Sequence, residues 1–293
     1  MIPVVVITPV KNEAKYIEQT IASVLAQTCL PSQWIIVDDG STDNTASIVS
    51  KYVGSYPWIT LLRINNSHEE RKGGSKVVRA FNYGYTHESR KDFEYIVKLD
   101  GDLILPVNYF ETILKEFSDH EELGMCGGYI INRFSEKDER VEASEEYHVR
   151  GALKMLRKAC WEQIGGFKEV WNWDGLDVME ARFCGWDTRS INIPVIHLRP
   201  TSSAYNSLEH AYTSGYEAYK MGADFFLTLI RMVFKMKNKP FFKAGVSYYK
   251  GYIKAKKNKE KLVIPKQLAE FINKEHYKRL NIFKKKKFIS NGI

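Results

Sequence analysis

The feature that most constrains the fold is a pair of short, wholly apolar runs that each stop at a polar side chain. The first run, Val4–Ile7, is β-branched throughout and stops at Thr8. The second, Trp34–Val37, stops at Asp38. Runs of this length without polar alternation are typical of strands that are buried on both faces of a parallel sheet. Both runs therefore predict inner strands of an α/β protein.

Segments with the spacing of amphipathic helices alternate with the predicted strands. Helices are expected at about 13–26, 44–53 and 75–85, and further strands at 59–64 and 93–99. This repeated order indicates a Rossmann-like, mostly parallel sheet flanked by helices, in which ligands bind at the carboxyl ends of the strands. Five polar side chains fall at such ends: Thr8, Asp38, Asp39, Asp100 and Asp102.

Beyond Pro106 the pattern is less regular, and no internal repeat is present. The expected elements are a helix at 108–117, a strand at 124–131, an exposed loop at 135–146, a mixture of strand and turn at 153–161, a helix at 177–184 and a strand at 188–197. Regular alternation of strand and helix is therefore confined to the part of the chain before Pro106.

Charge divides the 293 residues into two parts. The net charge is +8, but from Met221 onward there are 19 Lys and Arg and only 4 Asp and Glu, a balance of +15. The first 220 residues have a balance of −7. We therefore expect an acidic α/β domain over residues 1–220 and a basic, aromatic, helical tail over residues 221–293. Such a tail favours an anionic partner, either a membrane or a nucleic acid.

The tail combines a short apolar segment with lysines and aromatic side chains. Its longest apolar run, Phe225–Phe234, has about half the length of a membrane-spanning helix. Lys284–Lys287 lies between Phe283 and Phe288. This pattern predicts a peripheral element on an anionic membrane surface. The alternatives are a helix packed on the body of the protein and a solvated run of charge. No nucleic acid partner is expected, because no recognised nucleic-acid-binding module accompanies the lysines.

The cysteines and the N-terminus bear on the compartment. Four Cys stand far apart without a C-x-x-C pair, which indicates neither a zinc site nor a disulfide framework and favours a reducing cytosol. The first residues, MIPVVVITPV, have no basic segment and too short an apolar run for a signal peptide. We therefore expect a cytoplasmic protein that is peripheral on the inner face of the cell membrane.

Two acidic turns follow predicted strands. Asp100–Asp102 (DGD) sets two carboxylates one residue apart, which suits a divalent cation such as Mg²⁺ or Mn²⁺, or a ribose hydroxyl. A polar turn is the alternative. In the stretch 38–43 (DDGSTD), we expect the last Asp or Asn44 to cap the next helix. One of Asp38 and Asp39 would then face the ligand.

A third cluster places aspartates among tryptophans. The segment Trp171–Asp177 reads WNWDGLD and is followed by Arg182 and by Gly185-Trp186. Partial desolvation raises the pKa of a carboxyl group toward the operating pH, so an Asp in this segment is a candidate general base. A buried Asp held by backbone donors before a helix is the alternative interpretation, and the spacing does not separate the two.

Together these motifs resemble family 2 glycosyltransferases of the GT-A fold, of the type that builds bacterial polysaccharides and other cell-surface glycans. The resemblance spans about residues 1 to 200 and rests on five motifs in order: Val4–Glu13, Val37–Asp43, Leu99–Asp102, Gly165–Phe167 and the acidic site before Gly185-Trp186. It implies inverting transfer of a sugar from a UDP- or GDP-sugar to the hydroxyl of a glycan or lipid-linked acceptor, with Mn²⁺ or Mg²⁺ as cofactor.

The resemblance also implies roles for individual residues. If this chain follows the family, it would hold the nucleotide through residues at the following positions: Thr8, Pro9, Glu13, Asp38, Asp39, Lys76 and Asp100. The metal is expected on Asp102, the more direct ligand of the D-x-D motif, together with Asp100 and His197. A core histidine at the end of a strand is the alternative interpretation of His197.

At the position of the catalytic base, the sequence departs from the family pattern. The family usually has Glu-Asp and a further acidic residue two positions on. Here Trp173 stands in place of the Glu, and the next Asp, Asp177, lies three positions after Asp174. Counting back from Gly185 by the family's usual interval favours Asp174 as the base that takes the acceptor proton. Asp177 stays an alternative.

Two other functions stay open from the sequence. A nucleotidyltransferase also uses a parallel sheet and paired carboxylates, but it normally has a Gly-rich, basic loop directly after the first strand. This chain has TPVKNE there. A catalytically inactive module that binds nucleotide-sugars would keep both the fold and the tail.

Overall fold

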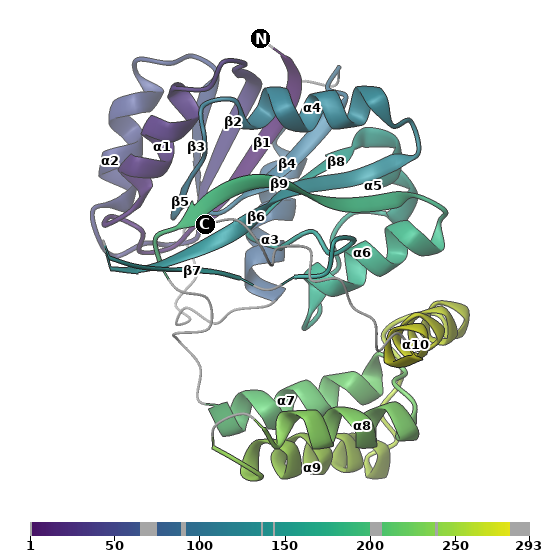
Figure 1. Ribbon diagram of the computed structural model, residues 1–293. Helices are drawn as coiled ribbons and strands as arrows, with labels where there is room; N and C mark the ends of the chain where they lie inside the picture. The colour runs from purple at the N-terminus through teal and green to yellow at the C-terminus, as the bar shows by residue number, and fades with distance from the viewer. Residues whose placement is uncertain are drawn as a thin grey trace. The chain divides into compact units, whose positions relative to one another are not determined.

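The two apolar runs at the start of the chain form adjacent parallel strands, β1 (Ile2–Val10) and β2 (Pro31–Asp38) (Figure 1). The computed structural model describes residues 2–64, 75–88, 92–135, 137–142, 144–199, 207–237 and 240–281. The chain divides into two compact units, the first over residues 1–201 and the second over residues 202–287. Every strand in the described ranges belongs to the first unit.

A nine-stranded mixed sheet forms the centre of the first unit, as far as the chain is described. Its other strands are β3 (Ile59–Arg63), β4 (Tyr95–Leu99), β5 (Leu103–Ile104), β6 (Leu123–Ser135), β7 (Asp138–Val141), β8 (Leu153–Arg157) and β9 (Asp187–His197). The strand order is β3-β2-β1-β4-β8-β6-β9-β5, and β7 pairs with β6. The part β3-β2-β1-β4 is parallel, as the sequence predicted. Strand β8 runs antiparallel to both β4 and β6, and β9 runs parallel to β6.

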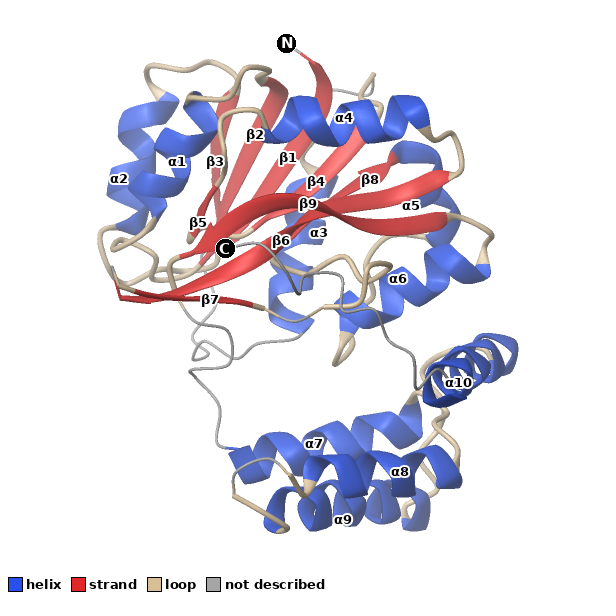
Figure 2. Cartoon of the chain, in the orientation of Figure 1, coloured by secondary structure: helices blue, strands red, loops and turns tan. Residues whose placement is uncertain are grey.

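Helices cover both faces of this sheet (Figure 2). They are α1 (Ile17–Leu25), α2 (Thr45–Val53), α3 (Ser75–Thr86), α4 (Tyr109–Asp119), α5 (Lys158–Ile164) and α6 (Trp173–Phe183). In β1, Val4 and Val6 pack with residues of α1, α2 and α4, whereas Val5 and Ile7 pack with residues of α3, α5 and α6. All four side chains are fully buried, which is why no polar residue alternates in this run. The predicted α/β fold is confirmed.

Helix α6 begins at Trp173, four residues earlier than the sequence predicted. The stretch before Asp177 has the local preferences of a turn, because it contains Gly175 and Asn172, and Asn172 has a left-handed φ of +60°. However, Trp173 is only 7% exposed and packs on Phe167 with ring centroids 5.0 Å apart. Burial of this large aromatic side chain outweighs the local turn preference.

Two further segments differ from the sequence prediction. Residues 153–161, expected as strand and turn, form β8 followed at once by α5, which buries Cys160, Trp161 and Ile164 on one face. The expected exposed loop at 135–146 contains β7. Most of β7 is exposed, so its pairing with β6 leaves no apolar pattern from which a strand could be predicted.

The second unit consists of helices in its described residues: α7 (Ser207–Lys220), α8 (Phe225–Lys235), α9 (Lys243–Lys257) and α10 (Lys266–Asn281). Helices α7 and α9 approach closely at glycines. A Cβ on Gly215 would lie 1.8 Å from the carbonyl oxygen of Tyr248, and one on Gly251 would lie 2.0 Å from that of Tyr212. This packing joins α7 to the basic helices, so the unit begins at residue 202, whereas the composition changes at Met221.

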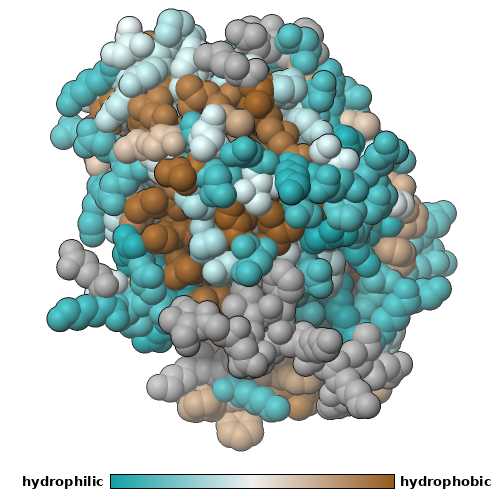
Figure 3. Space-filling model, turned by 45° about the horizontal axis from the view of Figure 1, so that its top comes forward, coloured by the Kyte–Doolittle hydropathy of each residue, from teal (hydrophilic) through white to brown (hydrophobic). Residues whose placement is uncertain are grey.

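Exposed large apolar side chains are concentrated in the second unit. The first unit has only scattered ones among its described residues, and Figure 3 shows hydrophobic side chains (brown) interspersed with hydrophilic ones (teal). The second unit exposes Tyr212, Phe225, Phe226, Val233, Phe234, Phe241, Phe242, Val246, Leu262 and Val263. No described helix combines the length and the apolar character needed to cross a membrane.

Candidate active site

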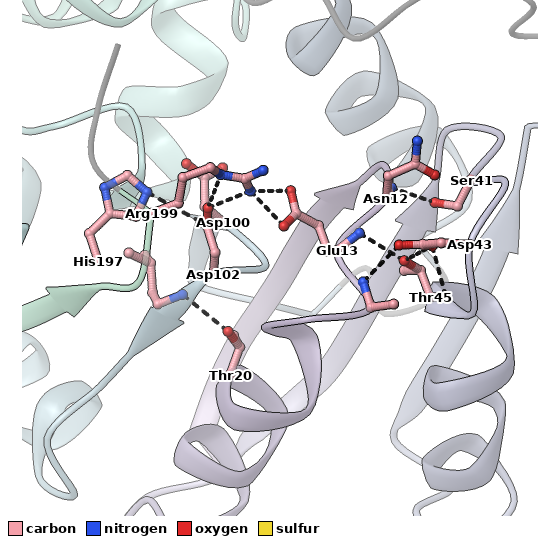
Figure 4. Close-up of polar contacts among 12 residues, drawn as sticks. Asn12, Glu13, Thr20, Ser41, Asp43, Thr45, Asp100, Asp102, His197 and Arg199 are labelled. Carbon is pink, nitrogen blue, oxygen red and sulfur yellow. Dashed lines mark hydrogen bonds and ion pairs between the residues drawn. The ribbon is translucent and has the colours of Figure 1, made fainter. Parts of the chain in front are cut away.

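The loops that follow β1 and β2 are joined by hydrogen bonds at the carboxyl ends of these strands (Figure 4). The Asn12 N–H donates to the Ser41 hydroxyl at 2.9 Å, and the Glu13 N–H donates to the Thr45 hydroxyl at 2.8 Å. Asn12 adopts a positive φ of 55°, a conformation that Asn tolerates better than most residues. The two loops therefore form one connected edge above the parallel strands.

Asp43 strengthens this connection and caps α2. Its carboxylate accepts hydrogen bonds from the N–H groups of Ala14 (3.1 Å) and Thr45 (3.0 Å). Burial raises the pKa of Asp43, but the hydrogen bonds from Thr45 and Ala14 lower it by more, so the pKa lies below its ordinary value. Asn44 makes no capping bond through its side chain. Of the two expected capping residues, Asp43 is the one that caps.

Asp38 and Asp39 lie at the end of β2, as predicted. Asp38 is fully buried, and its carboxylate accepts from the Ser41 N–H at 2.8 Å and lies 3.3 Å from Arg63 Nε. Asp39 is 7% exposed, and its N–H donates to the carbonyl oxygen of Val10 at 2.9 Å. Both residues therefore help to shape the strand-end turn.

Thr8, Pro9 and Lys76 occupy different surroundings. The Thr8 side chain is fully buried, and its hydroxyl accepts a hydrogen bond from the Trp34 indole at 2.9 Å. Pro9 is also buried and pairs in register with Val37 of β2. Lys76 lies in the first turn of α3. Thr8 is thus engaged inside the protein, and a nucleotide contact through any of these three residues stays a prediction.

Arg199 joins two carboxylates that lie far apart in the sequence (Figure 4). Its Nη2 lies 2.5 Å from Glu13 Oε1 and 2.6 Å from Asp102 Oδ2. The other oxygen of Asp102 lies 3.4 Å from His197 Nε2. The side chains of Glu13 and Asp102 are 4% and 5% exposed, whereas that of Arg199 is 25% exposed and lies over the Tyr16 ring. The structure thus brings together the D-x-D motif, the loop after β1 and the end of β9.

Positive groups surround both carboxylates of the D-x-D motif. Burial lowers the pKa of His197, but the hydrogen bond and charge of Asp102, together with the charge of Asp100, raise it by more, so the net pKa is raised. For Asp100, in contrast, burial raises the pKa. The adjacent Lys98 ammonium group opposes this effect, but the net pKa stays raised. Lys98, His197 and Arg199 therefore lie close to the carboxylates of Asp100, Asp102 and Glu13.

Asp102 and His197 carry donor atoms of the types that a divalent cation accepts. A carboxylate and an imidazole lie 3.4 Å apart, and Asp100 is close enough to interact electrostatically with both. Carboxylate oxygens and imidazole nitrogens are ligands that Mn²⁺ accepts. Within the described ranges, no group of three or more His, Cys, Asp and Glu is arranged to hold a metal ion.

Two buried lysines lie next to the D-x-D motif. Lys98 of β4 pairs in register with Lys154 of β8, and the two are 2% and 0% exposed. Lys98 contacts Asp100, and Lys154 Nζ lies 2.5 Å from Asp177 Oδ2. Both ammonium groups also face the Trp173 ring, at 5.6 and 5.1 Å from its centroid. Trp173, the first residue of α6, therefore contacts both lysines, and cation–π attraction offsets part of the hydration that they lose.

The two candidate bases have different surroundings. Asp177 is 1% exposed; burial raises its pKa, and the Lys154 charge opposes the rise. Asp174 lies in the first turn of α6 and is partly exposed. It lies directly against Gly151, where a Cβ would be 2.7 Å from Asp174 Cβ and 3.0 Å from Oδ2. Asp174 is therefore the more accessible of the two carboxylates.

Comparison with known proteins decides the family. The family model described as "Glycosyl transferase family 2" matches residues 5–182. The chain belongs to this family. Glycosyltransferase GlyG of Streptococcus pneumoniae is 32% identical over 124 residues, which cover 42% of this chain and 38% of GlyG. Chondroitin synthase of Pasteurella multocida is 28% identical over 171 residues, which cover 55% of this chain and 17% of the synthase. The chain thus matches well under half of the length of either relative.

Solved structures with this fold include two glycosyltransferase complexes. TarS 1–349 of S. aureus in complex with UDP-GlcNAc has a TM-score of 0.56 and 16% identity, covering 86% of this chain and 72% of that one. The mannosyltransferase PcManGT of Pyrobaculum calidifontis in complex with GDP-Man and Mn²⁺ has a TM-score of 0.54 and 16% identity, covering 96% and 81%. At this identity the likeness concerns the fold, and the predicted GT-A fold of this family 2 chain is confirmed.

Three cations beside the candidate site were missed by sequence reasoning: Lys98, Lys154 and Arg199. A signal was present for two of them, because Lys98 interrupts the apolar strand YIVKL directly before the D-x-D motif and Lys154 interrupts LKMLR. A lysine inside a strand that is otherwise buried needs a partner, since an unpaired buried charge is very costly. Arg199 had no such signal, because its two partners come from distant parts of the chain.

Proposed function

We propose that this family 2 glycosyltransferase is an inverting enzyme that moves a sugar from a UDP- or GDP-sugar to an acceptor hydroxyl during assembly of a cell-surface polysaccharide or glycolipid. The observation that carries the proposal is that Arg199 bridges Glu13 and Asp102, while Asp102 also contacts His197. In α/β proteins this edge of the sheet is where ligands bind. The nucleotide-sugars bound by TarS and PcManGT support the donor class.

The proposed metal site uses Asp102, with Asp100 and His197 beside it. When bound there, Mn²⁺ or Mg²⁺ would offset the negative charge of the departing diphosphate. The Mn²⁺ in the PcManGT complex supports this assignment. The chain's own contribution is electrostatic: Arg199 and Lys98 hold the carboxylates of Asp102 and Asp100 in place.

We assign the general base to Asp174. In the proposed step, its carboxylate takes the proton of the acceptor hydroxyl while that oxygen attacks the anomeric carbon from the face opposite the diphosphate. Partial exposure of Asp174 and its position in the first turn of α6 support this role, since the helix N-terminus favours a carboxylate. Lys154 holds this turn by donating to Asp177 at 2.5 Å and to the carbonyl oxygen of Asp174 at 3.2 Å.

The nucleotide is proposed to lie against the joined loops after β1 and β2. Thr8, Glu13 and one of Asp38 and Asp39 would hold the base and ribose, with Pro9 next to Thr8 in β1. Lys76 would contact the diphosphate from the start of α3. The hydrogen bonds that lock the two loops together support a preformed site, because binding then orders few additional groups.

We further propose that the protein works at the cytoplasmic face of a membrane, to which its basic helical part binds peripherally, and that the acceptor is a glycan or is linked to a lipid. The balance of +15 after residue 220 supports this placement. The Lys284–Lys287 run that contributes to this charge lies outside the described residues.

Donor turnover tests the proposal. The full chain is incubated with UDP- and GDP-sugars with and without Mn²⁺, and release of sugar and nucleoside diphosphate is measured. Metal-dependent release supports a glycosyltransferase, whereas pyrophosphate exchange would identify a nucleotidyltransferase. Tight nucleotide binding without either reaction would indicate a catalytically inactive binding module. A thermal-shift screen of UDP and GDP with Mn²⁺ shows beforehand which of the two nucleotides the protein prefers, because a ligand that binds only the native state raises the melting temperature.

A further inference from the structure

Helix α8 of the second unit exposes an apolar face. Phe226, Val233 and Phe234 are 62%, 54% and 56% exposed. Their spacing of i, i+7 and i+8 places them on the same side of the helix. Leu227 and Thr228, in the first turn of the same helix, are buried. Phe226 also contacts the Tyr277 ring of α10, with ring centroids 6.3 Å apart, so α10 borders one end of this exposed apolar face.

The turn between α8 and α9 continues this apolar surface. Phe241 and Phe242 are 56% and 70% exposed, and Val246 in the first turn of α9 is 40% exposed. The N–H of Phe242 donates to the carbonyl oxygen of Met236 at 3.0 Å, which ties the turn back to the end of α8. The backbone that carries the exposed Phe242 ring is therefore hydrogen-bonded to the end of α8. We call Val233, Phe234, Phe241 and Phe242 the aromatic turn.

The outer side of α9 is basic. Lys243, Lys250, Lys254 and Lys257 are exposed and recur at i, i+7, i+11 and i+14, which places them on one face of the helix. The opposite face buries two tyrosines and two glycines among other residues. From Phe225 to Lys259 the sequence contains ten Lys and Arg and no Asp or Glu. Acidic side chains within this segment therefore cannot neutralise the lysines.

We propose that the aromatic turn and the lysine face of α9 form a docking surface for an anionic lipid bilayer. The exposed rings enter the boundary between headgroups and acyl chains, and the lysines bind the anionic headgroups while their alkyl stems cover apolar surface. This inference gives a definite surface to the peripheral placement proposed above and rests on that placement. It does not depend on the donor, the acceptor or the catalytic residues.

Charge and exposure favour a bilayer over other occupants. A second copy of this chain would bring the same ten cations together, which Coulomb repulsion opposes. A nucleic acid duplex, whose bases are already stacked and paired, would engage the lysines but would leave the rings of Phe241 and Phe242 unused. An anionic bilayer uses both features in one contact.

The experiment is sedimentation of the full chain with vesicles at low salt. Vesicles of phosphatidylcholine mixed with phosphatidylglycerol are compared with phosphatidylcholine alone. The test variants are Phe241→Ser/Phe242→Ser and Lys243→Gln/Lys250→Gln/Lys254→Gln. Each has a matched control on exposed residues of the first unit: Phe134→Ser/Phe183→Ser and Lys51→Gln/Lys115→Gln/Lys137→Gln. Circular dichroism confirms that each variant keeps its helical content.

We expect the wild type and both controls to sediment with the anionic vesicles and to be released by high salt, because the lysine contribution is screened. The lysine variant should bind about tenfold more weakly or worse, since one Lys near an anionic surface adds about fivefold. The phenylalanine variant should weaken binding by about tenfold as well, because two rings no longer enter the bilayer. Equal binding to both vesicle types, no binding, or test variants that bind like their controls would overturn the proposal. Tighter binding to a duplex oligonucleotide than to anionic vesicles would also overturn it. Donor turnover without vesicles is measured separately, so failure of the proposed chemistry is distinguishable from failure of this surface.

Discussion

The two units of this chain bury charge in different ways. In the first unit, buried lysines are paired with carboxylates: Lys154 with Asp177 and Lys98 with Asp100. In the second unit, the half-buried His276 faces cations. Burial, followed by the charges of Arg231 and Arg279, lowers its pKa to about 3. One unit therefore pairs its buried lysines with carboxylates, whereas the other places a half-buried imidazole beside arginines, which disfavour its protonation.

This difference shows which groups each unit holds in a fixed geometry. A buried ion pair is seldom a net gain in stability over an apolar pair, but it fixes the geometry of the groups around it. In the first unit that geometry belongs to the D-x-D motif and to the first turn of α6. The second unit has no comparable pair among its fully buried side chains, as far as they are described, and it presents cations and rings on its surface instead.

The largest expected effect concerns the ion cluster of the first unit. Asp102→Ala should abolish metal-dependent donor binding, because it removes the proposed direct ligand and a partner of both Arg199 and His197. Isothermal titration with UDP or GDP in the presence of Mn²⁺ measures the loss. Binding to anionic vesicles should be unchanged, since it belongs to the second unit. Unaltered nucleotide affinity in Mn²⁺ would refute the metal assignment.

Breaking the buried pair should unfold the first unit more easily. Lys154→Met leaves Asp177 buried without its cation and should cost about 3 to 5 kcal/mol of unfolding free energy. All six Trp lie between residues 34 and 186, so Trp fluorescence during urea unfolding reports the first unit alone. The double variant Lys154→Met/Asp177→Leu should recover most of the loss. If Lys154→Met were as stable as the wild type, the claim that the buried cation of Lys154 is needed to compensate Asp177 would be refuted.

Replacing the proposed base should affect catalysis without affecting stability. Asp174→Asn should lower transfer by roughly 100-fold or more while donor affinity stays near normal, as expected for loss of a general base. Asp177→Asn is the comparison: it should lower stability, because it weakens the contact to Lys154. An Asp174→Asn enzyme with full activity, together with an inactive but folded Asp177→Asn enzyme, would exchange the two assignments.

The smallest expected effect is a pH dependence of the second unit. The pKa of His276 is lower in the folded chain than in the unfolded chain, so below about pH 6.5 the unfolded chain binds a proton that the folded one does not. Stability should therefore fall as the pH falls, by about 1 kcal/mol between pH 6.5 and 5.5. His276→Gln should remove this part of the dependence. The helical signal at 222 nm follows it, and a slope that is identical in the variant would contradict the prediction.

The sequence alone predicted that the first unit has an α/β fold with strands buried on both faces. Fully buried strands must be apolar on both sides, and this requirement is visible in Val4–Ile7 and Trp34–Val37 without any tertiary information. The acidic residues after the strands were equally predictable, since a polar group at the end of a buried run has to lie at an edge of the sheet. The start of α6 was not predictable, because burial of Trp173 against Phe167 overrides a local turn preference.

What the sequence determined by itself is therefore the α/β fold, the acidic strand ends and the separation of an acidic part from a basic one. Only the tertiary structure decided which charges meet. Arg199 reaches Glu13 across 186 positions, and the register of β4 with β8 sets Lys98 beside Lys154. The physical reason is that local sequence fixes backbone preference and apolar pattern, whereas a buried charge is stabilised by whichever partner the fold brings within about 3 Å of it.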